Sequence, residues 1–184
     1  MRQIRLKCRL NGAALIVILL LCAGCSLGGG AAATPSATIT LATTLPRATF
    51  TNPTYGYSID YPTDVIVEAE RDEFIWLDGQ ISILVSSFNP EEAIGGGQVI
   101  ETAADIVVGN FNARRLSGTI GAVGGNTPQR YESLAIPHEG SYYVVTVYEL
   151  RNDVVLPAER ELGEIPPEAR DLFEQVVSSF RFEG

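Results

Sequence analysis

Hydrophobic and polar residues alternate along much of this chain with the period of two that is typical of β-strands. The clearest run is 55–61, where every second residue is large and apolar: Tyr55, Tyr57, Ile59 and Tyr61. Pro62 ends this run, because proline has no N–H to donate to a strand ladder. A shorter apolar run predicts a second strand at 65–68.

Three pairs of apolar runs are separated by turn-forming residues and predict β-hairpins. The first joins 74–77 to 80–88 across Asp78-Gly79, a dipeptide suited to the positive φ values of a tight turn. The other two hairpins pair 105–108 with 111–117 and 129–136 with 141–151.

Residues 141–151 carry large side chains on both faces, which predicts a central strand that is covered on both sides. Between the hairpins, 89–104 and 118–126 are rich in glycine or other turn-forming residues. We expect loops there, with one helical turn at 99–104.

The last element has the spacing of a helix. Pro166, Pro167 and Glu168 suit its first turn. Its apolar residues recur at every third or fourth position and form one stripe: Ala169, Leu172, Phe173, Val176, Val177 and Phe180. Strands joined mainly by hairpins and followed by a late amphipathic helix predict an α+β fold with a mainly antiparallel sheet.

The N-terminus has the layout of a bacterial export signal. Four basic residues precede a mostly apolar run at 13–23, which is shorter than the roughly 20 residues of a spanning helix and suits a signal peptide. Ala23-Gly24-Cys25 resembles the lipobox of lipoprotein precursors, although Cys22 stands where leucine is usual. We predict a signal peptide at 1–24, cleavage between Gly24 and Cys25, and fatty acylation of Cys25; an uncleaved signal anchor is the alternative.

The remaining chain divides into a linker and one globular domain. Residues 25–48 hold the lipidated cysteine and a stretch rich in threonine, alanine, glycine and proline, which has little to bury. Residues 49–184 are long enough for a core of their own. The predicted location is the cell membrane or outer membrane, with the domain on the extracytoplasmic side.

Charge narrows the choice of partners. The chain has 13 basic and 22 acidic residues, and every acidic residue follows Cys25. Removal of the signal peptide takes away four basic residues and leaves nine, so the mature net charge becomes −13. Nucleic acid and anionic lipid headgroups are therefore poor partners for the domain. Weak binding of a divalent cation by an acidic loop stays open.

The residues that usually carry catalysis are scarce in the predicted domain. All three cysteines lie at or before Cys25, so the domain has neither a thiol nucleophile nor a cysteine metal site. His138 is the one histidine, and it lies in a predicted Pro-His-Glu-Gly turn. We predict no enzyme activity, no cofactor and no metal centre.

Three residues are candidates for a binding surface: Arg114, Arg115 and Tyr143. Arg114 and Arg115 are neighbours on a predicted strand, so their side chains point to opposite faces of the sheet. We expect at least one of them to pair with acidic residues over a sheet face. Tyr143 belongs to the aromatic run of the predicted central strand.

Two segments resemble PsbP-like domains. The opening Phe50-Thr51-Asn52 and Tyr55-Gly56-Tyr57-Ser58-Ile59-Asp60-Tyr61-Pro62 is similar to the family's first strand and Tyr-Pro corner, although Val65 stands where tryptophan is usual. The close, from Phe173 to Phe182, is similar to its last helix and final strand. The resemblance implies a sheet flanked by helices in an α/β/α sandwich. It also implies a protein-binding or stabilising module, because family members include a photosystem II subunit, a Ran-binding factor and bacterial lipoproteins.

The sequence leaves three hypotheses for the function. The first is a non-enzymatic module that binds another extracytoplasmic protein while it is anchored to a membrane by lipid on Cys25. The second is a small hydrolase that works with carboxylates alone. The third is a lipoprotein that captures a small ligand, which requires an enclosed pocket.

Overall fold

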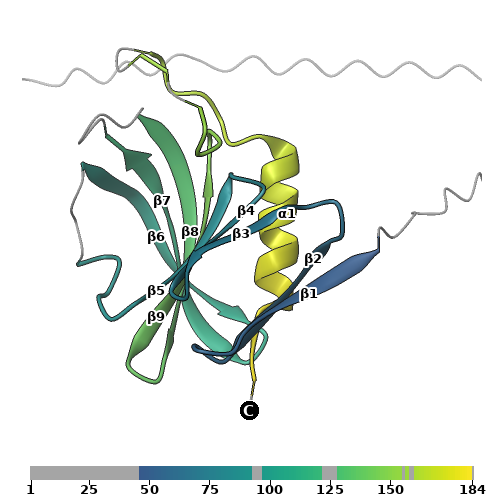
Figure 1. Ribbon diagram of the computed structural model, residues 1–184. Coiled ribbons are helices and arrows are strands. Elements are labelled where there is room, and N and C mark those ends of the chain that lie inside the picture. Colours follow the sequence, from purple (N-terminus) through teal and green to yellow (C-terminus); the bar gives the residue numbers. More distant parts are fainter. Residues whose placement is uncertain (1–45, 93–96, 122–127, 155, 158–159, 184) are drawn as a thin grey trace, which may run out of the picture. The chain divides into compact units, whose positions relative to one another are not determined.

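The structure is a computed structural model that describes residues 46–92, 97–121, 128–154, 156–157 and 160–183 (Figure 1). The predicted signal peptide, Gly24, Cys25 and almost all of the predicted linker lie outside these residues. The described elements are β1 (Arg47–Asn52), β2 (Tyr57–Pro62), β3 (Val67–Arg71), β4 (Phe74–Leu77), β5 (Ile81–Ser86), β6 (Gln98–Val108), β7 (Phe111–Ile120), β8 (Gln129–His138), β9 (Ser141–Tyr148), α1 (Pro167–Ser179) and β10 (Arg181–Phe182).

The strands form two antiparallel sheets. The larger sheet has seven strands in the order β3-β4-β5-β9-β8-β7-β6, and the smaller has three in the order β1-β2-β10. The α+β class, the antiparallel sheet and the C-terminal helix are therefore confirmed. In the described part of the chain, the elements that cover the larger sheet are α1 and the smaller sheet.

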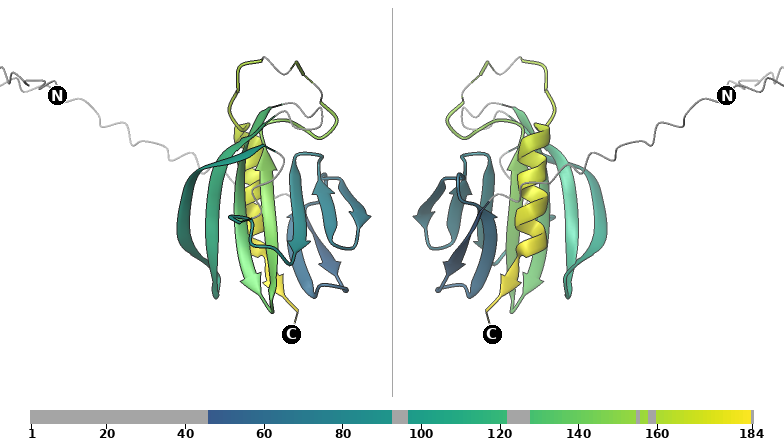
Figure 2. Two further views of the ribbon diagram at one scale, coloured as in Figure 1. Left: turned by 90° about the vertical axis from the view of Figure 1, so that its left-hand side faces the viewer. Right: turned by 90° about the vertical axis from the view of Figure 1, so that its right-hand side faces the viewer.

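Helix α1 runs along one face of the larger sheet, which we call the inner face (Figure 2). It contacts β9 of that sheet and β2 of the smaller one. Its buried residues are Ala169, Phe173, Val176 and Val177, which belong to the predicted apolar stripe. Among the described residues, no helix combines the length and the hydropathy that are needed to cross a membrane.

The core lies between α1, the smaller sheet and the inner face. Tyr57 and Ile59 of β2 are fully buried there, together with residues from three strands of the larger sheet: Ile81, Ile83, Leu134, Ile136, Val145 and Val147. Burial of one such aliphatic or aromatic side chain contributes roughly 1.5–3 kcal/mol. The helix and both sheets are therefore held together by one shared apolar cluster.

The three predicted hairpins are confirmed. Asp78 and Gly79 join β4 to β5 with φ values of 49° and 65°, the positive values expected of this dipeptide. Strand β9 is the fourth of the seven strands, and it buries Val145 on the inner face and Thr146 on the opposite, outer face. The prediction of a central strand covered on both sides is therefore also correct.

Three local predictions were wrong. Residues 98–104 belong to β6 rather than to a loop with a helical turn, because a bulge between Ile100 and Thr102 breaks the period of two that would have revealed the strand. Gly118 lies inside β7 rather than in a loop. Strand β1 was not expected, and it begins at Arg47, within the predicted linker.

Candidate functional site

A cleft of about 570 Å³ lies on the inner face, beside the first half of α1. Its walls come from β6, β7, β8 and the segment that leads into α1. Six charged residues line it, three of each sign: Arg115, Arg130, Arg170, Glu101, Glu132 and Glu164. We call it the charged cleft.

Strand register places two of these residues on the inner face. Arg115 of β7 lies opposite Leu134 of β8, and Glu132 of β8 lies opposite Val147 of β9. Leu134 and Val147 are both buried in the core that faces α1. Arg115 and Glu132 therefore point toward the helix at the edge of that core.

Arg115, Glu132, Arg170 and Glu174 form an ion-pair network between the sheet and α1. The Arg115 guanidinium donates hydrogen bonds to the carboxylates of both Glu132 and Glu174. Nε of Arg170 lies 3.7 Å from Oε2 of Glu132. Burial opposes the charge on Arg115, but the hydrogen bonds to Glu174 and Glu132 outweigh it and raise its pKa. The Arg115 side chain thereby links the sheet to the helix.

The outer end of the charged cleft is more open. The Arg130 guanidinium lies 3.5 Å from the Glu101 carboxylate, and both side chains are about half exposed. Nε of Arg130 also donates to the Gly163 carbonyl at 3.1 Å. Strand β8 therefore presents Arg130 and Glu132 side by side on one face, and each is already paired with a group from another element.

Glu149 fixes the segment that forms the upper wall of the charged cleft. Its carboxylate accepts hydrogen bonds from the backbone N–H of Arg130 at 3.0 Å, from the backbone N–H of Gly163 at 2.7 Å and from the Arg160 guanidinium. Burial alone would raise the pKa of Glu149, but these hydrogen bonds prevail and lower it. The ionised carboxylate thus connects the end of β9 to the chain just before α1.

The geometry of the charged cleft suits binding better than proton transfer. Two of its three carboxylates, Glu101 and Glu132, are engaged by arginines. A general acid must instead hold a proton that it can donate to the substrate. In the described part of the chain, no group of three or more His, Cys, Asp or Glu side chains is placed to bind a metal ion.

The three residues predicted for a binding surface do not share one surface. Arg114 and Arg115 do point to opposite faces, and Arg114 pairs on the outer side with Glu91 and Asp105. Tyr143 is only 5% exposed, and its hydroxyl donates to the Tyr55 carbonyl. The expectation that Tyr143 lies on a surface was wrong, because an inward-facing residue of a central strand is covered by the core.

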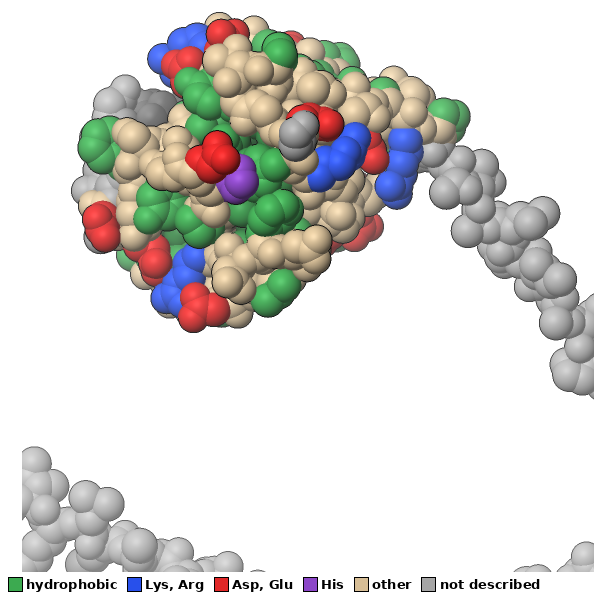
Figure 3. Space-filling view, turned by 90° about the horizontal axis from the view of Figure 1, so that it is seen from below, with side chains coloured by type: hydrophobic (Ala, Val, Ile, Leu, Met, Phe, Trp, Pro, Cys, Tyr) green, Lys and Arg blue, Asp and Glu red, His purple; other side chains and the backbone are tan. Residues whose placement is uncertain are grey.

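His138 lies at the lower end of the domain, in an aromatic cluster rather than beside a nucleophile. Its ring stacks on Phe182 at 3.6 Å and approaches Phe111 and Tyr143 edge-on. Figure 3 shows His138 set among hydrophobic side chains. The imidazole therefore packs the last strand, β10, against the larger sheet.

Sequence reasoning missed five residues that form ion pairs in or beside the charged cleft: Glu101, Arg130, Glu132, Arg170 and Glu174. A signal for two of them was available, because Arg130 and Glu132 are two positions apart on a predicted strand and so share a face. Nothing local indicated that α1 would bring Arg170 to the same place.

The chain matches no family model, and no curated protein matches its sequence. Among the solved structures to which it is similar is the solution structure of cyanobacterial PsbP (CyanoP) from Synechocystis sp. PCC 6803. The two share 12% sequence identity, and the alignment covers 81% of this chain and 99% of the other, with a TM-score of 0.45. The structural neighbour is thus a PsbP-like protein.

Proposed function

We propose that this chain is a non-enzymatic module, anchored to the outer side of a membrane by lipid on Cys25, that binds another extracytoplasmic protein through the charged cleft. The observation that supports this proposal is the arrangement of the cleft. It is open, and five of its six charged residues are paired with one another.

Such pairs suit recognition of a polypeptide that carries both signs of charge. Arg130, Glu101 and Arg170 are about half exposed, so a partner can reach them without unfolding the domain. A partner's carboxylate can replace Glu101 at Arg130. The planar Arg130 guanidinium can bind such a carboxylate with two parallel hydrogen bonds. The partner segment we expect is therefore one with both acidic and basic side chains.

The anchor defines which partners are within reach. The predicted linker after Cys25, residues 26–48, would give a mean span of roughly 25 Å if it behaves as a random coil. That span lets the domain stand clear of lipid headgroups. The partner would accordingly be a membrane protein of the same face or a protein close to it.

Crosslinking in intact cells tests the cleft as the contact surface. Arg130 and Arg151 are a matched pair, because each is ion-paired and their side chains are 43% and 44% exposed, but only Arg130 lines the cleft. We expect Arg130→Glu in the tagged full-length chain to lower the yield of the crosslinked partner by about tenfold, since reversal of the charge converts attraction into repulsion. Arg151→Glu should leave the yield unchanged. Equal yields for both variants would contradict the proposal.

A further inference from the structure

The outer face of the larger sheet also buries side chains, although it lies opposite α1. Leu116, Tyr131 and Ser133 are each less than 5% exposed there, and Thr146 and Val144 are less than 10% exposed. Ser133 and Thr146 are cross-strand partners whose hydroxyls are hydrogen-bonded at 2.8 Å. The side chains in the middle of this face are therefore buried rather than exposed to solvent.

A hollow of about 230 Å³ lies over this sheltered patch. We call it the outer cavity. Its walls come from β5, the segment after it, and the strands from β6 to β9. Twelve described residues line it: Leu84, Ser86, Phe88, Pro90, Gln98, Leu116, Ile120, Tyr131, Ser133, Val144, Thr146 and Tyr148. None of these side chains is charged, which distinguishes the outer cavity from the charged cleft.

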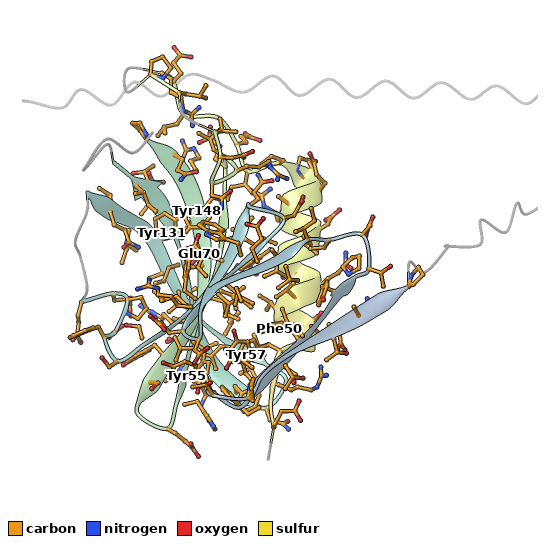
Figure 4. All side chains as sticks on the ribbon, viewed as in Figure 1. Phe50, Tyr55, Tyr57, Glu70, Tyr131 and Tyr148 are labelled. Carbon is orange, nitrogen blue, oxygen red and sulfur yellow. The ribbon has the colours of Figure 1, made fainter. Side chains whose placement is uncertain are left out.

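One polar group in the outer cavity lacks a partner. Tyr131 and Tyr148 are cross-strand partners, so their side chains lie on the same face of the sheet (Figure 4). Both residues line the outer cavity. Its hydroxyl oxygen is buried, yet no described residue forms a hydrogen bond of normal geometry with it. Burial raises the pKa of Tyr131, and a hydrogen-bonding interaction with the Gln98 side chain, on the same wall, opposes this rise only in part. The group is therefore a neutral, buried hydroxyl without a described partner of normal hydrogen-bond geometry.

The chain offers an internal comparison. Tyr57 also has a buried hydroxyl without a hydrogen bond, and burial raises its pKa to about 12. Its ring, however, lies in the aromatic core against Phe180 and Tyr143, and it does not line the outer cavity. Of these two buried hydroxyls without a hydrogen bond, that of Tyr57 lies inside the core and that of Tyr131 belongs to a residue that lines the outer cavity.

We propose that the outer cavity binds a small, uncharged organic molecule that places an apolar body against Leu84, Leu116 and Val144 and accepts a hydrogen bond from the Tyr131 hydroxyl. A ketone, an ester or an alcohol meets this description. A charged ligand is excluded, because the lining supplies no counter-charge and desolvation of an ion would go uncompensated.

The volume limits the size of the ligand. A water molecule occupies about 30 Å³ in the liquid, so the outer cavity has the volume of roughly seven or eight waters. A molecule with fewer than about ten non-hydrogen atoms fills such a space. The charged cleft, which the proposed function uses, lies on the other face of the sheet, although Leu116 and Tyr131 contribute to the walls of both sites. The charged residues on which the proposed function depends do not line the outer cavity, so the two proposals can still fail independently.

A fluorescence titration of the full-length chain tests this site. Trp76 is the one tryptophan of the chain, and its ring centroid lies 5.6 Å from that of Tyr148, a wall of the outer cavity. We expect cyclohexanone, a neutral ring with a carbonyl acceptor, to change the Trp76 emission with a saturable titration curve. Cyclohexanecarboxylate, a similar ring that carries a charge, should produce no saturable change.

Three variants make the result decisive. Tyr131→Phe should weaken cyclohexanone binding by about fivefold, because one hydrogen bond is lost, whereas Tyr57→Phe should leave it unchanged. Val144→Phe, checked for folding by circular dichroism, should abolish binding by filling the hollow. The proposal is overturned if cyclohexanone gives no saturable change, if the carboxylate binds equally well, or if Tyr131→Phe binds as tightly as the wild type.

Discussion

Glu149 illustrates at the scale of one residue how a buried carboxylate organises a long connection. Its side chain is 4% exposed, and its partners come from β8 and from the segment before α1. Arg160, which donates to it, is also mostly buried and gives a second hydrogen bond to the Pro128 carbonyl. Removal of the carboxylate charge would leave the guanidinium buried without its counter-ion.

We expect Glu149→Gln to lower the free energy of unfolding by about 3 kcal/mol, the usual cost of breaking a buried ion pair on one side. Urea denaturation measures this change. Glu161→Gln, at an exposed carboxylate next to Arg160, is the control and should change it by less than about 0.5 kcal/mol. A loss in Glu149→Gln that is no larger than in the control would contradict the assigned role.

The same residue predicts a pH dependence. The folded-state pKa of Glu149 lies below the ordinary value of 4.5, so the ionised form is favoured in the folded protein. Its contribution to stability is therefore complete above pH 4.5 and declines as the pH falls through the lower, folded-state pKa. The wild type should lose this contribution on acidification, whereas Glu149→Gln should show a flatter profile over that range in urea denaturation at stepwise pH. Parallel profiles would refute the prediction.

At the scale of elements, the β6–β7 hairpin depends on one glycine. Gly118 lies opposite Ile100, next to the bulge of β6, and a Cβ atom at this position would lie 1.9 Å from the Val99 carbonyl oxygen. Strand β7 pairs with β8 on its other side, so it has little freedom to move away. No other residue type can occupy this position without separating the strands.

We expect Gly118→Ala to destabilise the domain by roughly 3 kcal/mol, since the clash involves backbone atoms and cannot be relieved by a rotamer change. Gly109→Ala is the matched control in the same hairpin, because its added Cβ would meet no atom within 4 Å. At a φ of 56° the alanine should cost about 1 kcal/mol. Thermal and urea unfolding of both variants measure the difference, and equal costs would show that the bulge can shift.

At the scale of the whole molecule, the proposed function separates attachment from recognition. The predicted anchor is a single lipidated residue, Cys25, whereas the described domain supplies the charged cleft and the outer cavity. One acyl chain binds a membrane only weakly, so stable attachment requires the two or three chains that lipoproteins carry. Substitution of the anchor should therefore change where the protein resides without changing how it folds.

We expect Cys25→Ser to move the protein from the membrane fraction to the supernatant of washed cells or to the growth medium. Intact-mass measurement of the wild type should give a chain that begins at Cys25 and carries the added mass of acyl groups. Cys22→Ser is the control, because residue 22 lies within the predicted signal peptide and should be absent from the mature chain. A Cys25→Ser protein that remains in the membrane fraction would rule out the lipid anchor.

The sequence by itself determined the features that depend on neighbouring residues. The α+β class, the three hairpins and the buried stripe of α1 follow from periods of two or 3.6 residues and from turn residues such as Asp78-Gly79. The same local rule placed Arg114 and Arg115 on opposite faces. Where the local period is interrupted, as at the β6 bulge, this reasoning failed.

Only the tertiary structure decided which distant residues meet. Arg115 reaches Glu174 across 59 positions because the register of β7 on β8 and the packing of α1 bring them together. The outer cavity likewise combines five strands, β5 to β9, whose order in the sheet differs from their order along the sequence. A site of this kind depends on strand order and helix packing, which arise from the burial of the whole core rather than from any one segment.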